Sequence, residues 1–331
     1  MKSPRGVIAL SLLAGCILPE AGPLTRFEFV ETHMATPCEI KLYAASEEEA
    51  RSAAAAAYAE MAAIDESMND WKADSEISRL SRTSGRDLPV SDRLFDVLEA
   101  SLRYSELSDG AFDVTVGPIV KLWRQAKTER KLPDPSVLRK ALDAVGYRHV
   151  TLHPDKHTVR LEVPGMSLDV GGIAKGYACD RALAILKRRG LARALVNTGG
   201  GMAFGDPPPG KMGWNIQVAD TDEVLVLSNC GVATSGDWER FVTVDGKRYS
   251  HIVDPKTGLG LTNRALVTVV APTGMAADAL TKCVMVPGAE RGLRLAESLP
   301  GTQAWMRWEE GGLVRTAQTR GFTNLLRPGG C

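Results

Sequence analysis

Leu168-Asp169-Val170-Gly171-Gly172-Ile173-Ala174-Lys175-Gly176 is the stretch that constrains the fold most, because an apolar segment passes through two glycines into a helical pattern. We expect a strand from Leu168 and a helix from about Lys175 to Arg189. Backbone N–H groups at such a helix start, beside a Lys and a carboxylate, suit an anion such as a pyrophosphate. A tight strand-to-helix turn with a solvated Lys explains the same residues. The spacing matches neither a nucleoside-triphosphate P-loop nor a dinucleotide-binding motif.

The segments on either side predict a mixture of helices and strands. Apolar periodicity and Gly or Pro breaks predict helices at 47–68, 91–107, 136–145, 276–284 and 290–299, and strands at 38–43, 149–153, 158–162, 193–197, 214–218, 223–227, 240–244 and 266–271. Strands 149–153 and 158–162 read as a hairpin. Strands and helices interleave up to residue 201, and the later strands favour an antiparallel sheet. The pattern indicates an α/β (α+β) protein with mixed, largely antiparallel sheets and flanking helices.

Length and composition are those of a soluble globular protein. The chain has 331 residues, of which 44% are hydrophobic and 24% charged, and its 40 Lys and Arg balance its 40 Asp and Glu. The chain therefore has enough apolar residues for a sizeable core. Without a basic excess to neutralise phosphates, nucleic acid is not expected as a partner.

The first residues predict export rather than a part of the fold. Lys2 and Arg5 precede a short apolar run, 6–15, which is typical of a signal peptide and too short to span a bilayer. Leu13-Ala14-Gly15-Cys16 resembles the lipobox of bacterial lipoproteins, whose Cys is acylated; a plain secretory signal is the alternative. We expect a signal peptide at 1–15, a tether at 16–25, and a protein anchored by lipidated Cys16 on the periplasmic side of a membrane.

The other cysteines show no zinc spacing and no C-x-x-C pair. They are Cys38, Cys179, Cys230, Cys283 and Cys331. A free Cys in apolar surroundings usually behaves as a small buried hydrophobe. We therefore expect no essential disulfide.

Two further segments concentrate groups that could carry chemistry. The stretch 249–258 contains His251 and two expected turns, at Asp254-Pro255 and at Thr257-Gly258. Turn formation alone also explains the Asp and the Thr. Helical spacing at 277–282 places Asp278, Thr281 and Lys282 on one face. A carboxylate there could hold a hard metal ion through oxygen, with phosphates completing its shell. A helix-start Asp without a ligand is the simpler explanation.

Taken together, these segments resemble the FAD:protein FMN transferase family, known as the ApbE family. The matching segments are 68–71, 74–80, 110–118, 169–176, 197–201, 234–237, 250–258 and 277–280. They span about residues 26–325, which leaves 326–331 as a tail. The resemblance implies a single ApbE-type, T-fold-like domain with FAD in a cleft between two lobes. It also implies an enzyme that cleaves FAD, attaches FMN to a Thr of a partner protein by a phosphoester bond, and releases AMP. Magnesium is implied as the assisting metal ion.

Site residues follow from the resemblance by motif position. The implied contacts to the flavin nucleotide are Met34, Trp71, Ala111, Phe112, Asp113, Asp169, Lys175 and Ile252. Gly172, through its carbonyl, and Asp278 are implied magnesium ligands. Lys175 would neutralise the pyrophosphate, and His251 is the best-placed general base for the acceptor Thr. Trp71 offers a ring for stacking on a flavin or adenine, or packs at the rim without a ligand.

The sequence departs from the family's pattern at two positions. Ser81 stands where the family usually has Asn, and Lys282 stands where a Thr metal ligand is expected. Either Thr281 replaces the missing hydroxyl while Lys282 turns to a phosphate or to solvent, which we favour, or the ammonium substitutes for part of the metal's charge. Three activities stay open. The protein could transfer FMN to an acceptor, which we expect to be a membrane redox subunit, hydrolyse FAD to FMN and AMP, or bind FAD as a carrier with little turnover.

Overall fold

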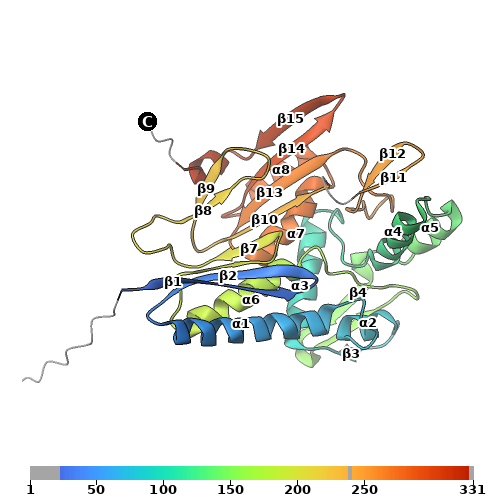
Figure 1. The fold of residues 1–331 in the computed structure, drawn as a ribbon. Coiled ribbons are helices and arrows are strands. Elements are labelled where there is room, and N and C mark those ends of the chain that lie inside the picture. The colour runs from blue at the N-terminus through green and yellow to red at the C-terminus, as the bar shows by residue number, and fades with distance from the viewer. Residues whose placement is uncertain (1–22, 238–240, 328–331) are drawn as a thin grey trace, which may run out of the picture.

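The computed structural model describes residues 23–237 and 241–327, and most of them belong to one large sheet and the helices packed on it (Figure 1). The helices are α1 (Glu47–Met68), α2 (Glu76–Ser81), α3 (Asp92–Leu107), α4 (Gly117–Glu129), α5 (Pro135–Leu142), α6 (Ala174–Arg188), α7 (Gly274–Met285) and α8 (Ala289–Ser298). The strands are β1 (Thr25–His33), β2 (Thr36–Ala44), β3 (Leu88–Pro89), β4 (Val150–His153), β5 (Thr158–Leu161), β6 (Ala194–Asn197), β7 (Gly201–Phe204), β8 (Trp214–Gln217), β9 (Val224–Leu227), β10 (Gly231–Gly236), β11 (Phe241–Val244), β12 (Lys247–Ser250), β13 (Ala265–Ala271), β14 (Gln303–Glu310) and β15 (Leu313–Gln318).

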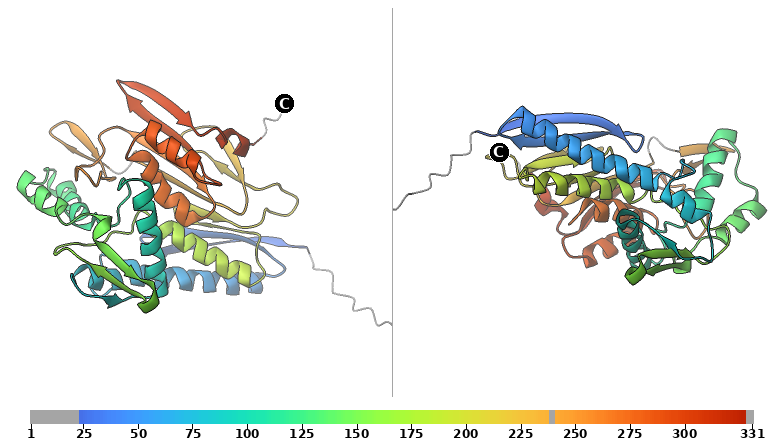
Figure 2. Two further views of the ribbon diagram at one scale, coloured as in Figure 1. Left: turned by 180° about the vertical axis from the view of Figure 1, so that it is seen from behind. Right: turned by 90° about the horizontal axis from the view of Figure 1, so that it is seen from below.

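Eight strands form the main sheet in the order β1-β2-β6-β7-β10-β13-β14-β15, and every neighbouring pair is antiparallel. Helices α1, α6, α7 and α8 cover one face of this sheet, and Figure 2 shows them as a layer over the strands. A separate apolar cluster that includes Phe204, Trp214 and Phe322 covers part of the other face, under hairpin β8–β9. All seven residues of β13 are buried because both faces are covered there.

Local sequence signals explain where the helices begin. Ser46 accepts a hydrogen bond from Glu49 N at the start of α1, and Ser91 accepts one from Leu94 N at the start of α3. Ser91 is therefore the N-cap that its sequence position predicted. Hairpin β4–β5 and the helices expected near 175–189, 276–284 and 290–299 are confirmed with shifts of one or two residues at their ends.

The strand expected from Leu168 is wrong. Residues 168–170 form a loop after a single bridge between Val116 and Ser167. The backbone N–H groups here do not form the hydrogen-bond ladder of a strand. Leu168 N donates to Ser81 Oγ (3.0 Å), and Asp169 N donates to Val114 O (2.8 Å). Ser81, the first departure from the family's pattern, thus positions the start of this loop.

Helices α6 and α7 approach each other through glycines. A Cβ atom added to Gly176 would lie 2.1 Å from the carbonyl oxygen of Gly274, closer than any real contact allows. Asp180, on α6, also links the two helices, because its carboxylate accepts hydrogen bonds from Gly274 N (2.7 Å) and Met275 N (2.8 Å) at the start of α7. Burial raises the pKa of Asp180 to about 6 despite these two donors. The close contact sets the distance between the two helices that carry the candidate site.

The first hairpin of the chain joins the sheet through a distant strand. Glu39 to Leu42 of β2 pair with Asn197 to Ala194 of β6. Ile40, on this part of β2, is fully buried in the main core cluster, which also contains residues of α1. Residues from all of α1 to α6 lie between the two paired strands in sequence.

In residues 23–237 and 241–327, no helix is long and apolar enough to cross a membrane. Within the same part of the chain, Cys38, Cys179, Cys230 and Cys283 are free thiols. The signal peptide expected at 1–15, Cys16 with most of its tether, and Cys331 lie outside the described residues.

Candidate active site

The loop before α6 places Asp169 among charged groups. Its Oδ1 accepts a hydrogen bond from Gly171 N (2.9 Å), which folds the loop back toward α6. Its Oδ2 lies 3.2 Å from Nη2 of Arg124. Burial raises the pKa of this carboxyl above its usual range, and the nearby carboxylate of Asp70 acts in the same direction, while Arg124 opposes them.

Arg124, on α4, links this loop to the exposed Trp71. Its Nη1 binds Asp70 Oδ2 at 2.5 Å, and its guanidinium lies 4.3 Å from the centre of the Trp71 ring. Trp71 is 76% exposed, so its ring is held at one side by a cation and is open to solvent. Both the stacking and the rim-packing interpretations of Trp71 are compatible with this placement.

Sequence reasoning missed Arg124. Its helix, α4, is oriented by the preceding residue, because Trp123 Nε1 donates to Gly258 O at 2.7 Å. Gly258 lies 135 positions further along the chain, so no local pattern reveals that contact. The amphipathic pattern after Pro118 was the available signal for the helix, although not for its role.

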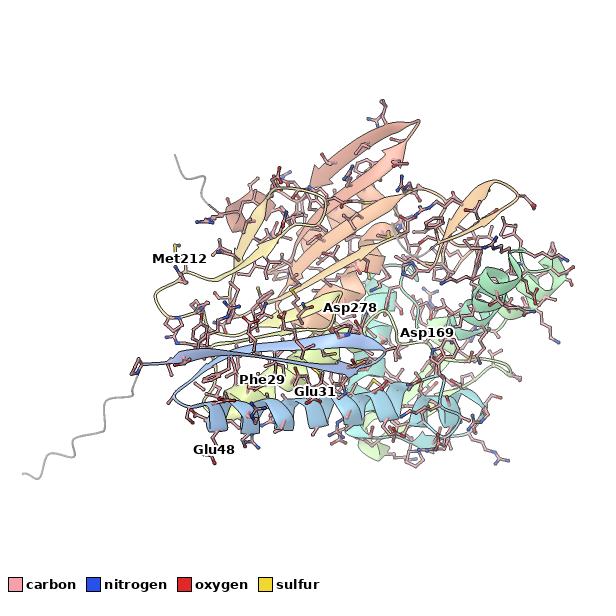
Figure 3. All side chains as sticks on the ribbon, viewed as in Figure 1. Phe29, Glu31, Glu48, Asp169, Met212 and Asp278 are labelled. Atoms are coloured by element: carbon pink, nitrogen blue, oxygen red, sulfur yellow. The ribbon has the colours of Figure 1, made fainter. Side chains whose placement is uncertain are left out.

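Asp278 and Lys282, both on α7, meet the loop at Gly172. Nζ of Lys282 lies 2.6 Å from Asp278 Oδ1, 3.1 Å from Asp278 O and 3.1 Å from Gly172 O. The other carboxylate oxygen, Oδ2 of Asp278, accepts a hydrogen bond from Gly176 N at 3.2 Å. Figure 3 labels Asp278 and Asp169 close together, beside the tip of hairpin β1–β2. The start of α6, its preceding loop and α7 therefore form one polar cluster.

The expected orientation of Lys282 is wrong. Instead of turning away from Asp278, its ammonium binds the two residues that the resemblance assigns to magnesium. The hydroxyl of Thr281 points to β10 instead: it donates to Asp278 O (2.7 Å) and lies 2.8 Å from Oγ of Ser235. The arrangement of Gly172, Asp278 and Thr281 does not fit a divalent ion while the ammonium lies between them.

Lys175 and hairpin β1–β2, which carries Met34, both lie against the glycine turn between β6 and β7. A Cβ atom on Gly200 would lie 3.4 Å from Nζ of Lys175, so the ammonium is directed at this turn. Met34 occupies the two-residue turn of hairpin β1–β2 with a φ of 51°, and Thr36 of the same hairpin packs against Gly199. The structure thus brings Lys175 and the hairpin that carries Met34 to one turn.

The segment 111–113 lies on the far side of the loop. A Cβ atom on Gly172 would lie 3.2 Å from the ring of Phe112, so Phe112 packs directly against the predicted cation site. Asp113 is buried, which raises its pKa, and its carboxylate accepts hydrogen bonds from Thr115 N (2.8 Å) and Tyr147 N (2.8 Å). Ala111 is also buried. The side chain of Asp113 therefore orders the protein here, and a flavin contact by this segment stays a prediction.

His251 and Ile252 follow strand β12. His251 is exposed, whereas Ile252 is buried and its N–H donates to Ser250 Oγ at 3.0 Å. Nothing in these contacts tests the role of His251 as a base, which stays a prediction.

The chain resembles proteins of known family in sequence and structure. The ApbE family model matches residues 34–306. The "FAD:protein FMN transferase" of Treponema pallidum is 37% identical over 253 residues, which are 70% of each chain. That of Escherichia coli K12 is 30% identical over 279 residues, covering 80% of this chain and 79% of the relative.

Solved structures agree. The apo flavinyl transferase ApbE of Pseudomonas stutzeri superposes with a TM-score of 0.82 at 28% identity and covers 92% of this chain and 98% of its own. The ApbE protein of Thermotoga maritima gives a TM-score of 0.80 at 29% identity, with 92% and 100% covered. The fold expected from the resemblance, with a large antiparallel sheet and flanking helices, is confirmed. By sequence and by structure, the chain belongs to the ApbE family.

Proposed function

We propose that this protein is an FAD:protein FMN transferase. The observation that supports the proposal most directly is the polar cluster at the start of α6. The chain that carries it matches 70% of the length of a relative named FAD:protein FMN transferase. The positive end of the α6 helix dipole and the cation Lys175 suit the negative charge of a pyrophosphate. The exposed ring of Trp71 supplies a surface on which a flavin or adenine ring can stack.

The reaction is a phosphoryl transfer with a protein hydroxyl as nucleophile. The acceptor Thr oxygen attacks the phosphorus of the FMN half, and the bond from that phosphorus to the bridging oxygen breaks. AMP leaves with the bonding electrons, and a base takes the hydroxyl proton; His251 is our prediction for this base. Lys175 opposes the charge that builds up on the phosphates. Magnesium is expected in this family, but its proposed ligands here hold Lys282, so no step above depends on a metal.

One assay separates this function from its alternatives. The purified protein is incubated with FAD and an acceptor domain that contains the target Thr, and AMP and protein-bound flavin are followed by chromatography and mass spectrometry. A transferase releases AMP and labels the acceptor in equal amounts. Hydrolysis yields AMP and free FMN without label. A carrier binds FAD but yields neither AMP nor labelled acceptor. Either of these last two results would contradict the proposal.

Replacing Lys175 with Ala should weaken FAD binding about tenfold or more, because a charge-assisted hydrogen bond to an anion is worth roughly 1.5–3 kcal/mol. Flavin fluorescence titration measures the affinity. Lys187→Ala is the matched control, since Lys187 lies exposed in the last turn of the same helix. Equal affinities for the two variants, both folded, would argue against Lys175 as a pyrophosphate ligand.

We further propose that the protein is a periplasmic lipoprotein whose acceptor is a membrane redox subunit. The proposal rests on the sequence Leu13-Ala14-Gly15-Cys16 after a charged start. Cys16→Ser should move the protein from the membrane fraction to the soluble periplasmic fraction, as measured by fractionation and immunoblotting. A wild-type protein without acyl groups by mass spectrometry would refute the anchor.

A further inference from the structure

The ammonium of Lys282 occupies the place of a metal ion. A magnesium ion bound by the same groups would lie about 2.1 Å from Gly172 O and from Asp278 Oδ1. Nζ of Lys282 lies within 3.1 Å of both oxygens, so an ion at that position would overlap the ammonium. The two cations would also repel each other at this distance. The metal and the ammonium therefore exclude each other.

The surroundings of Lys282 match an ammonium in number and geometry. An ammonium has three N–H donors, and Nζ has three oxygen neighbours at 2.6–3.1 Å, which are hydrogen-bond distances rather than metal–oxygen distances. The aliphatic part of the side chain passes Gly172 closely, because a Cβ atom there would lie 3.4 Å from Lys282 Cε.

One of the three donors can be exchanged for a ligand. Asp278 O, which lies 3.1 Å from Nζ, also accepts a hydrogen bond from Thr281 Oγ1 and is a helix carbonyl with its own backbone donor at 282. It stays paired when Nζ turns away. The Lys282 side chain is 18% exposed, so it is not fully closed off from solvent. An N–H of Lys282 can therefore reach a phosphate oxygen while Asp278 and Gly172 hold the ammonium in place.

We propose that Lys282 is a tethered cation that replaces the divalent metal beside the pyrophosphate, so that FAD binding and AMP release need no metal ion. The inference rests on the proposed function and adds which cation neutralises the pyrophosphate. Within the described residues, no group of three or more His, Cys, Asp or Glu side chains lies together as an alternative metal site. The fixed positive charge next to the phosphates is therefore the one on Lys282, supported by Lys175.

Metal binding without FAD tests the proposal independently of activity. Mn²⁺ is titrated into the apoprotein, and the free ion is measured by electron paramagnetic resonance. The wild type should bind no Mn²⁺ in the submillimolar range. Lys282→Thr should bind one equivalent, because it frees the oxygens of Gly172 and Asp278. Stoichiometric binding by the wild type, or none by folded Lys282→Thr, would overturn the proposal.

FAD affinity supplies the second measurement. In the wild type, the dissociation constant should agree within about twofold between chelator and millimolar Mg²⁺. Lys282→Met keeps about the same side-chain volume and removes the charge, so it should bind FAD about tenfold more weakly than the wild type in chelator. Lys187→Met, an exposed Lys on α6 with Asn229 as its neighbour, should retain wild-type affinity. Melting temperatures identify any variant that fails to fold.

The outcomes distinguish this inference from the proposed function. AMP release by the wild type in chelator supports both. If AMP release or FAD binding requires Mg²⁺, the tethered-cation proposal is overturned, while the proposed transferase function stands. Unchanged FAD affinity in Lys282→Met has the same meaning. A protein that neither binds nor cleaves FAD with or without Mg²⁺ contradicts the proposed function itself.

Discussion

Replacing Asp278 with Ala should lower the free energy of unfolding by about 3 kcal/mol, the lower end of the range for breaking a buried ion pair on one side. Asp278 is 3% exposed, and its removal leaves the Lys282 ammonium without its closest partner and Gly176 N without an acceptor. Urea unfolding followed by circular dichroism measures the change. We expect FAD binding to fall as well, because the loop at Gly172 loses its link to α7.

A double variant separates the ion pair from the rest of the change. Asp278→Ala with Lys282→Met removes both charges, so it should recover most of the stability and remain within about 1 kcal/mol of the wild type, the cost of the unpaired N–H of Gly176. If the double variant is as unstable as Asp278→Ala alone, the loss does not come from an unpaired ammonium. FAD binding should not recover with stability, because the double variant also lacks the ammonium of Lys282.

Gly176→Ala should destabilise the protein by about 3 kcal/mol or more, the range of severe overpacking, although Ala normally stabilises a helix by about 1 kcal/mol relative to Gly. The added methyl group would lie 2.1 Å from Gly274 O, a backbone atom that cannot turn aside. Thermal and urea unfolding measure the loss. Helices α6 and α7 must move apart to relieve the contact.

The matched control is Ala55→Gly on the exposed face of α1. It makes the reverse exchange without any contact, so it should cost about 1 kcal/mol from helix propensity alone. The two exchanges should therefore both destabilise, although propensity predicts opposite signs. A Gly176→Ala variant more stable than the wild type would show that α6 and α7 are not in tight contact.

Local signals in the sequence were sufficient for most helices and several strands. Ser46 and Ser91 cap helices where a polar residue precedes an apolar period, and these contacts involve neighbours in the chain. The strands that were not predicted include short and edge strands, whose burial patterns depend on partners far away in sequence: β1, β3, β7, β10, β12, β14 and β15. Burial on both faces erases the alternation by which a strand is recognised.

The candidate site was predictable in its residues but not in its contacts. Helical spacing places Asp278 and Lys282 on one face, and their ion pair follows that spacing. The contact between Lys282 and Gly172 joins residues 110 positions apart, and only the packing of α6 on α7 creates it. For the same reason Arg124, which joins Asp169 to Asp70, carried no signal in the sequence.

The pairing of β2 with β6 sets an order of events for a chain that emerges from the ribosome N-terminus first. Hairpin β1–β2 can form early because its strands are adjacent, but its partner strand, Ala194–Asn197, appears only after about 150 more residues, the whole of α1 to α6. Closing so long a loop is slow, and the edge of β2 is unpaired until then. Until residues 194–197 have emerged, the main sheet therefore lacks the β2–β6 pair that joins its first two strands to the rest.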